Sequence, residues 1–396
     1  MGRKDLGAVR QRDRRFLTKA EPGGSEPGGS KLGGSEVEAG ATTCYTVTMH
    51  VTLIIPGPIT TVSGGYGYDR RIVAGLRQLG HVVELAELPG VHPVTDGLAR
   101  DAACAMLDRL TPGTRPIIDG LALPAFAGLG DALSASRAIG LIHHPTSLET
   151  GADEASQAAL RAIERRLFLR LPRLVVTSEP TAEGLAKAFG VDPARIRIVV
   201  PGTDDAPRCQ GSAGPTCQIL SVGTLIPRKG HDLLLRALAR LFDLDWHLTI
   251  VGSRSHDPVH ARGLLALAEQ LGIANRVTFA GEVVDDAFER LWQASDLFAL
   301  ATHYEGYGMA IAEALKRGLP VVVTAGGTAG SLLTPEAGLV CLVGDRDQLS
   351  KSLRRIIFGQ DLRREIAENA WRLGQTLPSW TDQAMLFADA LADTAA

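Results

Sequence analysis

The chain has 396 residues, of which 45% are hydrophobic and 21% are charged, and its formal net charge is -3. That length allows about two domains with cores that need no disulfide, and the charge excludes a basic domain of the kind that binds nucleic acids generally. The five cysteines form no Cys-x-x-Cys pair and no apolar run reaches the ~18 residues that span a membrane, so we expect a cytoplasmic protein without a cysteine zinc site.

Residues 1–48 differ in composition from the rest of the chain. A stretch rich in arginine and lysine precedes three Gly-Gly-Ser repeats, a composition typical of flexible linkers. We expect a disordered tail, or an upstream start ahead of a natural Met49. The segment lacks the apolar region of a secretory signal. A transit peptide or a lipid-binding arm is the alternative to a disordered tail.

From Met49 onward, apolar strands, loops and amphipathic helices alternate. Strands are expected at His50–Ile55, His81–Leu85, Pro116–Asp119, Ala138–Ile142, Arg173–Thr177 and Ile196–Val200. Helices are expected at Tyr68–Leu79, Ala99–Leu110 and Ala155–Arg170 and after the capping residue Ser178, with a loop at Pro56–Gly67.

The alternation restarts after a linker rich in Gly, Pro and Ser at 202–216. Strands are expected at Gln218–Val222, Trp246–Val251, Val277–Ala280, Leu297–Leu300 and Pro320–Thr324. Helices are expected at His231–Phe242, Val259–Leu271, Asp285–Ala294, Met309–Arg317 and Gln383–Leu391. The pattern predicts an α/β protein with two Rossmann-like, doubly wound parallel-sheet domains at 49–204 and 205–378 and a terminal helix within 379–396. Ligands should lie at strand ends, in the interdomain cleft.

Glycines follow the first expected strand in the segment Ser63–Gly67. Such a loop lets the backbone approach a ligand closely, and an NAD-binding turn is one interpretation. The NAD fingerprint is out of register, however, because Arg70 stands where a glycine is needed.

Polar residues stand at two further strand ends of the first half. Asp119 could serve packing or acceptor binding. His143 and His144 end the next strand, and adjacent side chains of a strand point in opposite directions, so the two rings do not readily share a metal. We therefore expect no metal site at these histidines. They either border a ligand or are simply two surface histidines.

Two cations lie between a strand and a helix in the second half. Arg228 and Lys229 end the segment that starts at Gly223, just before the helix at His231. Exposed amides and the helix dipole favour an anion there, arginine offers a planar fork and lysine a point charge. A diphosphate fits this set, although a solvated pair of charges is the alternative.

Two carboxylates with seven residues between them follow the strand that ends at Leu300. Glu305 lies in a glycine-containing turn, and Glu313 lies within the helix that follows. Carboxylates accept hydrogen bonds from the paired hydroxyls of sugars, and the amides that open a helix bind phosphate or hydroxyl oxygens. The alternative is an ordinary loop before a helix with a surface glutamate.

These segments resemble the GT4 family of retaining glycosyltransferases over about residues 49–393. Glu305 and Glu313 match the family's E-x7-E element, and Lys229 matches the lysine of its V-G-R-L-x-x-x-K-G element. Thr224 stands where many members have an arginine, and we infer that Arg228 supplies the missing charge.

The resemblance implies a GT-B fold, with the acceptor on the first domain, the nucleotide sugar on the second and the terminal helix packed back on the first. It implies that Glu313 binds the donor ribose and that Glu305 lies beside the transferred sugar. The implied donor-binding residues are Arg228, Lys229, Gly306, Tyr307, Gly308, Met309, Glu313, Gly64 and Gly65, and the implied catalytic residues are Glu305, His143 and His144.

The expected function is transfer of a hexose-type sugar from a nucleotide-diphosphate sugar to a glycan, lipid or small-molecule acceptor, without a metal or other cofactor. Alternatives are an NAD-linked oxidoreductase and a nucleotide-sugar-binding protein that has lost catalysis. The basic helix at 161–173 either packs its apolar face or docks on an anionic membrane. A peripheral position at the inner membrane face is therefore the alternative to a purely cytoplasmic one.

Overall fold

The computed structural model describes residues 48–148 and 153–392, which lie within one compact unit, Val47–Ala396. The predicted tail at 1–48 lies outside the described residues, apart from its last residue. Within the described residues, no helix has both the length and the apolarity that crossing a membrane requires.

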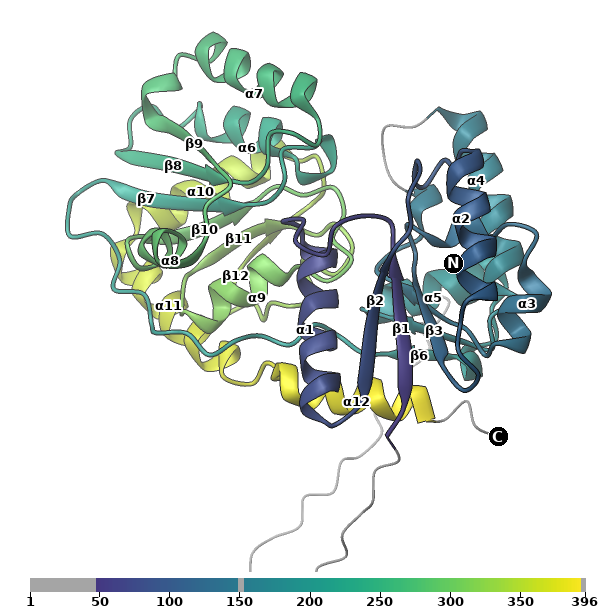
Figure 1. The fold of residues 1–396 in the computed structure, drawn as a ribbon. Coiled ribbons are helices and arrows are strands. Elements are labelled where there is room, and N and C mark those ends of the chain that lie inside the picture. The colour runs from purple at the N-terminus through teal and green to yellow at the C-terminus, as the bar shows by residue number, and fades with distance from the viewer. Residues whose placement is uncertain (1–47, 149–152, 393–396) are drawn as a thin grey trace, which may run out of the picture. The chain divides into compact units, whose positions relative to one another are not determined.

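The first half forms a six-stranded, wholly parallel sheet in the order β2-β1-β3-β4-β5-β6. Its strands are β1 His50–Ile55, β2 Val82–Glu87, β3 Arg115–Asp119, β4 Ile139–Ile142, β5 Arg173–Val176 and β6 Ile196–Ile198. Its helices are α1 Gly64–Gln78, α2 Gly97–Asp108, α3 Gly130–Ala135, α4 Glu154–Phe168 and α5 Glu179–Phe189 (Figure 1).

The second half forms another six-stranded parallel sheet, in the order β12-β11-β10-β7-β8-β9. Its strands are β7 Cys217–Val222, β8 Trp246–Val251, β9 Val277–Gly281, β10 Leu297–Leu300, β11 Val321–Thr324 and β12 Gly338–Cys341. Its helices are α6 His231–Leu238, α7 Pro258–Gln270, α8 Asp285–Gln293, α9 Met309–Lys316, α10 Arg346–Phe358 and α11 Gln360–Gly374. The strand order reverses between β7 and β10, which is where doubly wound sheets bind ligands.

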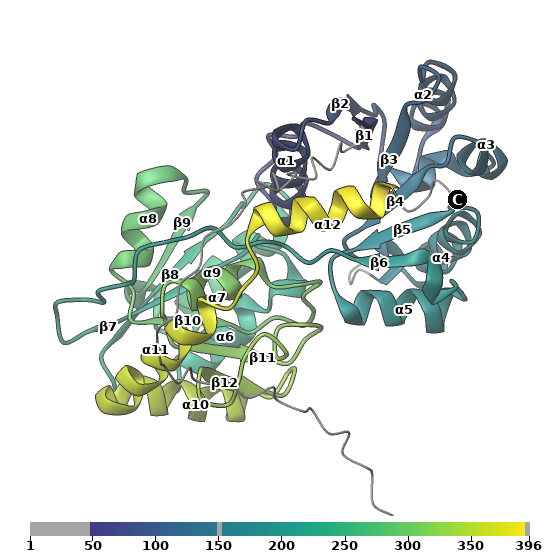
Figure 2. The same ribbon diagram turned by 90° about the horizontal axis from the view of Figure 1, so that it is seen from below.

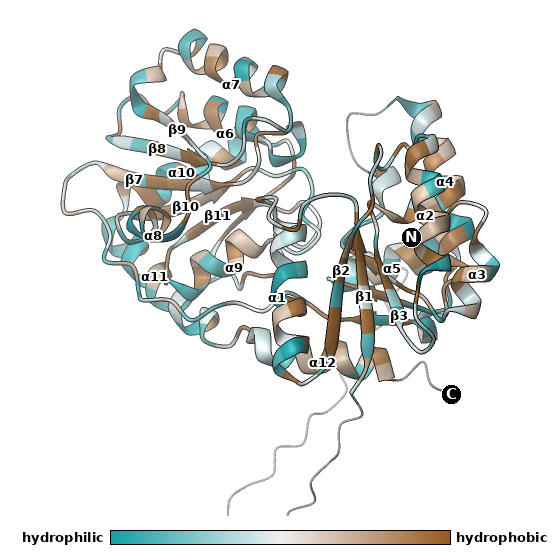
Figure 3. Cartoon of the chain, in the orientation of Figure 1, coloured by the Kyte–Doolittle hydropathy of each residue, from teal (hydrophilic) through white to brown (hydrophobic). Residues whose placement is uncertain are grey.

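Most strands of both sheets are nearly continuous apolar runs. Such strands are buried on both sides, so helices cover the two faces of each sheet. Figure 3 shows the strands as mostly hydrophobic, while the outer faces of the helices are hydrophilic. Separate apolar clusters lie on the two faces of each sheet and place the strand ends on a rigid base.

The last helix, α12 (Trp380–Ala392), packs against the first half of the chain beside α1 (Figure 2). Phe387 and Leu391 are fully buried in the same apolar cluster as residues of β1 and α1. Gly75 of α1 makes this approach possible, since a Cβ atom there would lie 2.4 Å from the Cβ of Ala384.

One predicted helix start is wrong, and several elements were not predicted. The helix α1 begins at Gly64 rather than Tyr68, because Ser63 caps it by accepting a hydrogen bond from the amide of Tyr66 (3.3 Å). No element was expected at 325–378, yet β12, α10 and α11 lie there. The spacing of Leu349, Leu353 and Ile356, all buried on one face of α10, was the signal for a helix.

Candidate functional site

A cleft of about 730 Å³ lies at the strand ends of both sheets. From the first half it is lined by the start of α1 and the loops after β3 and β4, and from the second half by the loops after β7, β8, β9 and β10 and the start of α9. All the site residues predicted from the sequence line it: Gly64, Gly65, His143, His144, Arg228, Lys229, Glu305, Gly306, Tyr307, Gly308, Met309 and Glu313.

The loop after β7 is held in place by two glycines with little free space. Gly230 has a φ of 63°, and a Cβ atom there would lie 2.0 Å from the carbonyl oxygen of Ala301. Gly223 packs against the aliphatic stem of Lys229, where a Cβ atom would lie 3.2 Å from Cδ. These contacts seat the Lys229 loop beside the end of β10.

The turn after β10 is fixed from behind by the segment after β11. The amide of Glu305 donates to the carbonyl of Gly326 (3.1 Å), and the amide of Thr328 donates to the carbonyl of Glu305 (3.0 Å). Gly327 has a φ of 63°, and a Cβ atom there would lie 2.1 Å from the Glu305 carbonyl oxygen. The backbone of Glu305 is therefore held as if it were part of the sheet.

Glu305 and Lys229 form a buried ion pair, with 2.7 Å between Oε1 and Nζ. Arg228 lies 4.0 Å from the same oxygen and donates to the carbonyl of Tyr304 (2.7 Å). Burial raises the pKa of Glu305, but Lys229 and Arg228 together outweigh that effect and hold it below its ordinary value. Glu305 is thus a carboxylate that fixes the lysine ammonium at the edge of the cleft.

Residues at the start of α9 reach the first half of the chain. A Cβ atom on Gly306 would lie 3.0 Å from the carbonyl oxygen of His143. The sulfur of Met309 lies 4.0 Å from the position of a Cβ atom on Gly64. Gly308, with a φ of 99°, precedes the helix in a conformation that favours glycine. The glycines therefore let the two walls of the cleft approach each other closely.

Glu313 lies on α9, one helical turn and more beyond Met309, and lines the cleft. Among the described residues, its carboxylate has no hydrogen-bond partner within the protein. Burial raises its pKa to about 7, while Arg317 and Arg71 lower it and Asp204 raises it. A half-buried carboxylate without a partner is suited to accept hydrogen bonds from a ligand.

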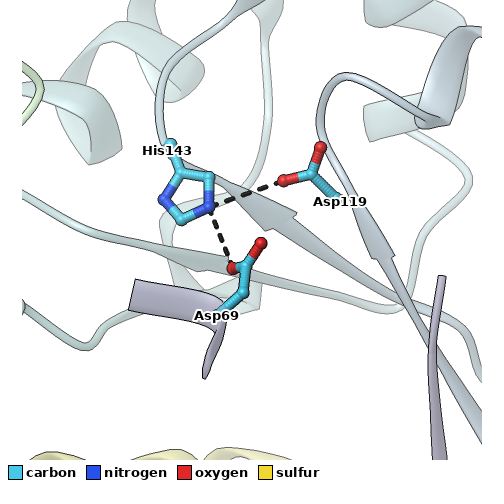
Figure 4. A group of neighbouring side chains, drawn as sticks. All are labelled: Asp69, Asp119 and His143. Carbon is cyan, nitrogen blue, oxygen red and sulfur yellow. Dashed lines mark hydrogen bonds and ion pairs between the residues drawn. The ribbon is translucent and has the colours of Figure 1, made fainter. Parts of the chain in front are cut away.

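His143 is held between two carboxylates at the end of β4 (Figure 4). Its Nε2 lies 3.1 Å from Oδ1 of Asp69, on α1, and 3.5 Å from Oδ2 of Asp119, at the end of β3. The other oxygen of Asp119 accepts from the amide of Leu121 (2.8 Å), which fixes that carboxylate. Both aspartates are buried, and Thr177 donates to the His143 carbonyl (3.1 Å).

The side chains of this cluster shift one another's pKa values. Burial lowers the pKa of His143, but Asp69 and Asp119 outweigh that effect and raise it above its ordinary value. Burial and the neighbouring Asp69 raise the pKa of Asp119 to about 7. The three ligand atoms lie within 4.8 Å of one another, a spacing at which Asp69, Asp119 and His143 could also bind a cation.

His144 faces the other wall, and its ring lies 5.2 Å from that of Tyr304, between centroids. Burial, together with Arg228 and His143, lowers the pKa of His144 to about 3, so the ring is neutral. The two histidines therefore point to different walls, as their adjacency predicted, and both border the cleft.

The loop after the histidines is anchored by Glu164 of α4, which is almost fully buried. Its carboxylate accepts hydrogen bonds from the amide and hydroxyl of Thr146 (2.6 and 2.7 Å) and from the amide and hydroxyl of Ser147. On the same helix, Leu167 and Phe168 pack into the core. The apolar face of this basic helix is therefore packed within the protein.

Sequence reasoning missed Asp69, Arg71 and Glu164. Asp69 lies in a helix, 74 residues from His143, and only the strand order β1-β3-β4 brings them together. Arg71 forms an ion pair with Asp204. A glutamate on the buried face of an amphipathic helix was the available signal for Glu164.

Residues 205–372 match the family model described as glycosyl transferases group 1. The match takes in the whole second sheet, with the Lys229 loop and the two glutamates. The resemblance to group 1 glycosyltransferases is thus confirmed for this segment, which is less than half of the chain.

Curated relatives agree with this class. D-inositol 3-phosphate glycosyltransferase of Mycolicibacterium gilvum is 34% identical over 214 residues, which are 49% of this chain and 48% of the relative. The protein of the same name from Actinosynnema mirum is 28% identical over 236 residues, 55% of this chain and 57% of the relative. The chain spans about half the length of the curated relatives it matches.

Solved structures confirm the GT-B fold. Sucrose-phosphate synthase from Thermosynechococcus elongatus superposes with a TM-score of 0.73, at 19% identity, over 87% of this chain and 98% of that one. A glycosyltransferase from Rickettsia africae gives a TM-score of 0.69, at 17% identity, over 88% and 99% of the two chains. Anabaena HepE in complex with UDP and glucose gives 0.70, at 17% identity, over 87% and 99%.

Proposed function

We propose that the chain is a retaining glycosyltransferase that moves a hexose-type sugar from a nucleotide-diphosphate sugar to a glycan, lipid or small-molecule acceptor. The observation that carries this proposal is the cleft, where Lys229, Glu305 and Glu313 from the segment matched to glycosyl transferases group 1 face the Gly64 and His143 wall. The HepE structure with UDP and glucose supports this type of donor by analogy of fold.

In the proposed complex, the donor diphosphate lies against the Lys229 loop and the amides that open α9. Arg228 and Lys229 face the position where negative charge grows as the diphosphate leaves, and preorganised cations there stabilise the transition state. Glu305 already holds the ammonium of Lys229 by an ion pair, so little reorganisation is needed. No metal is required for this charge, since two cations supply it.

The ribose and the transferred sugar of the donor meet carboxylates and the side of the cleft that the first half of the chain forms. Glu313 accepts hydrogen bonds from the ribose hydroxyls, and Glu305 lies next to the transferred sugar. His143 and His144 border that sugar from the other side. The bond from the anomeric carbon to the diphosphate breaks, the acceptor oxygen bonds on the same face, and the acceptor proton passes to the leaving diphosphate. Closure of the two walls orders both substrates and excludes water.

Donor turnover in the Lys229→Ala and Glu313→Ala variants tests this assignment. A thermal-shift screen with UDP-, GDP- and ADP-sugars and NAD first selects the donor. Release of the nucleoside diphosphate should then fall by about a hundredfold or more in each variant, while Lys187→Ala, an exposed lysine of α5, serves as the control. Unchanged turnover in both site variants would sink the site assignment, and stabilisation by NAD alone would favour an oxidoreductase.

Binding of a nucleotide sugar without turnover would identify a protein that binds donors but has lost catalysis. The cytoplasm, with or without contact to the inner membrane face, is the proposed location. Arg165 and Arg166 remain exposed on α4, and binding to anionic vesicles tests the membrane contact.

A further inference from the structure

The first wall of the cleft is defined here by Tyr66, Asp69, Arg70, Asp119 and His143, which all line it. If the cleft works as proposed above, this wall borders the transferred sugar at His143 and meets the acceptor beside it. Its acidic groups are two buried carboxylates, and its imidazole lies between them. The phenol of Tyr66 lies in the field of both aspartates, which raise its pKa further after burial has raised it, to about 12 in all. On this wall the oxygens of Asp69 and Asp119 accept hydrogen bonds, while the phenol of Tyr66 keeps its proton and can donate one.

The arginines on this side are already engaged by the protein. Nη1 of Arg70 donates to the carbonyls of Ile59 (2.6 Å) and Thr61 (3.0 Å), which ties the guanidinium to the loop after β1. Arg71 forms an ion pair with Asp204. Among the described residues that line the cleft, the other cations are Arg228 and Lys229, on the opposite wall. Both arginines thus make contacts within the protein.

The imidazole of His143 has one ring nitrogen left for a ligand. Nε2 of His143 faces the two carboxylates, and its Nδ1 has no partner among the described residues. A quarter of the side chain is exposed. One ring nitrogen beside the carboxyl groups of Asp69 and Asp119 can bind a hydroxyl but cannot balance the double charge of a phosphate ester.

We infer that the acceptor is a polyol without a phosphate group, whose hydroxyl or ammonium groups meet the Asp69–Asp119–His143 cluster. A phosphate on the acceptor would face two carboxylates at close range, and like charges at a binding surface cost affinity. Hydroxyl and ammonium groups donate to the carboxylates instead. The chain would thus differ in acceptor from the relatives named for inositol 3-phosphate.

Matched acceptors test this inference once the donor has been found. We would measure binding to the enzyme loaded with the nucleoside diphosphate, and turnover with the donor sugar, for glucose, glucosamine and glucose 6-phosphate and for myo-inositol and its phosphate. The phosphate esters should bind more weakly than the parent compounds, and be turned over more slowly, by at least about tenfold. Asp69→Asn and Asp119→Asn should narrow this ratio, and Asp131→Asn, an exposed aspartate of α3, should not change it.

Three results would overturn the inference. One is a phosphate ester that binds as well as its parent or better, with loss of that binding in Arg70→Gln. Another is a preference for the ester that appears with Mn²⁺ and vanishes in EDTA, since the cluster would then hold a metal ion. The third is failure of every unphosphorylated compound to bind. Donor binding and donor hydrolysis are measured separately, so each of these results leaves the proposed function standing.

Discussion

Lys229 and Glu305 are the residues on which the proposed donor site depends most. Each is largely buried, and each lies in a loop that glycine contacts hold tightly in place. Removing one partner of a buried ion pair leaves an uncompensated charge, whereas removing both together leaves a neutral site. Stability and donor binding should therefore respond differently to single and double substitutions.

Lys229→Met should lower the free energy of unfolding by about 2–4 kcal/mol, because it leaves the buried Glu305 carboxylate with only the more distant Arg228, at 4.0 Å. Adding Glu305→Gln should restore most of that loss but not donor binding. Chemical denaturation and calorimetric titration of the donor measure the two effects in one double-mutant cycle. Additive losses of stability would contradict the pairing of these two residues.

Glu313 should make donor binding depend on pH, because its pKa of about 7 leaves it partly protonated in neutral solution. Donor affinity should rise as the pH increases from 6 to 8, since the carboxylate accepts hydrogen bonds from the ribose better than the acid does. Glu313→Gln should remove this contribution. Titrations across the pH range, in both proteins, measure it; a slope that persists in the variant would assign it to another group.

The same shift has a consequence for stability. The folded protein holds the Glu313 proton more tightly than the unfolded chain does, so the stability that this proton confers is full below the ordinary pKa and is lost as the pH rises through 7. Glu313→Gln should therefore stabilise the protein at pH 8 by about 1–3 kcal/mol while weakening donor binding. Melting curves at pH 5 and pH 8 test this, and a gain at pH 5 alone would contradict it.

At the scale of elements, glycines set how loops and strands meet. Gly230→Ala should be severely destabilising, because its Cβ atom would collide with the Ala301 carbonyl at 2.0 Å. Gly272→Ala is the matched control: its φ is 70°, close to the 63° of Gly230, but a Cβ atom there meets nothing within 4 Å. Gly272→Ala should lower the free energy of unfolding by about 1 kcal/mol through backbone strain alone. Equal losses of stability in the two variants would show that the structure relaxes to avoid the collision at Gly230.

The sequence predicted those parts of the site that lie in one continuous segment. Glu305 to Glu313 and the Lys229 loop each join a strand end, a glycine turn and a helix start, so local spacing is enough to find them. Asp69 could not be found in this way. It lies in a helix to which no function was assigned, and its partners Asp119 and His143 lie at the ends of two later strands. Only the order of the parallel strands brings the three together.

At the scale of the whole molecule, the chain's last helix completes the core of its first half. Phe387 of α12 is fully buried with residues of β1 and α1. Phe387→Ala should lower stability by about 3–5 kcal/mol, whereas Phe358→Ala, 77% exposed at the end of α10, should change it little. Thermal unfolding compares the two, and similar melting temperatures would mean that α12 is not part of that core.

The most direct test of the proposed function is to follow a nucleotide-diphosphate sugar with the enzyme by NMR of its anomeric proton. With an acceptor present, the donor signal should disappear, a nucleoside diphosphate should appear, and the new glycoside should have the anomeric configuration of the donor. The Lys229→Ala and Glu313→Ala variants should leave the donor signal in place. A product of inverted configuration, or turnover that survives both substitutions, would contradict the account.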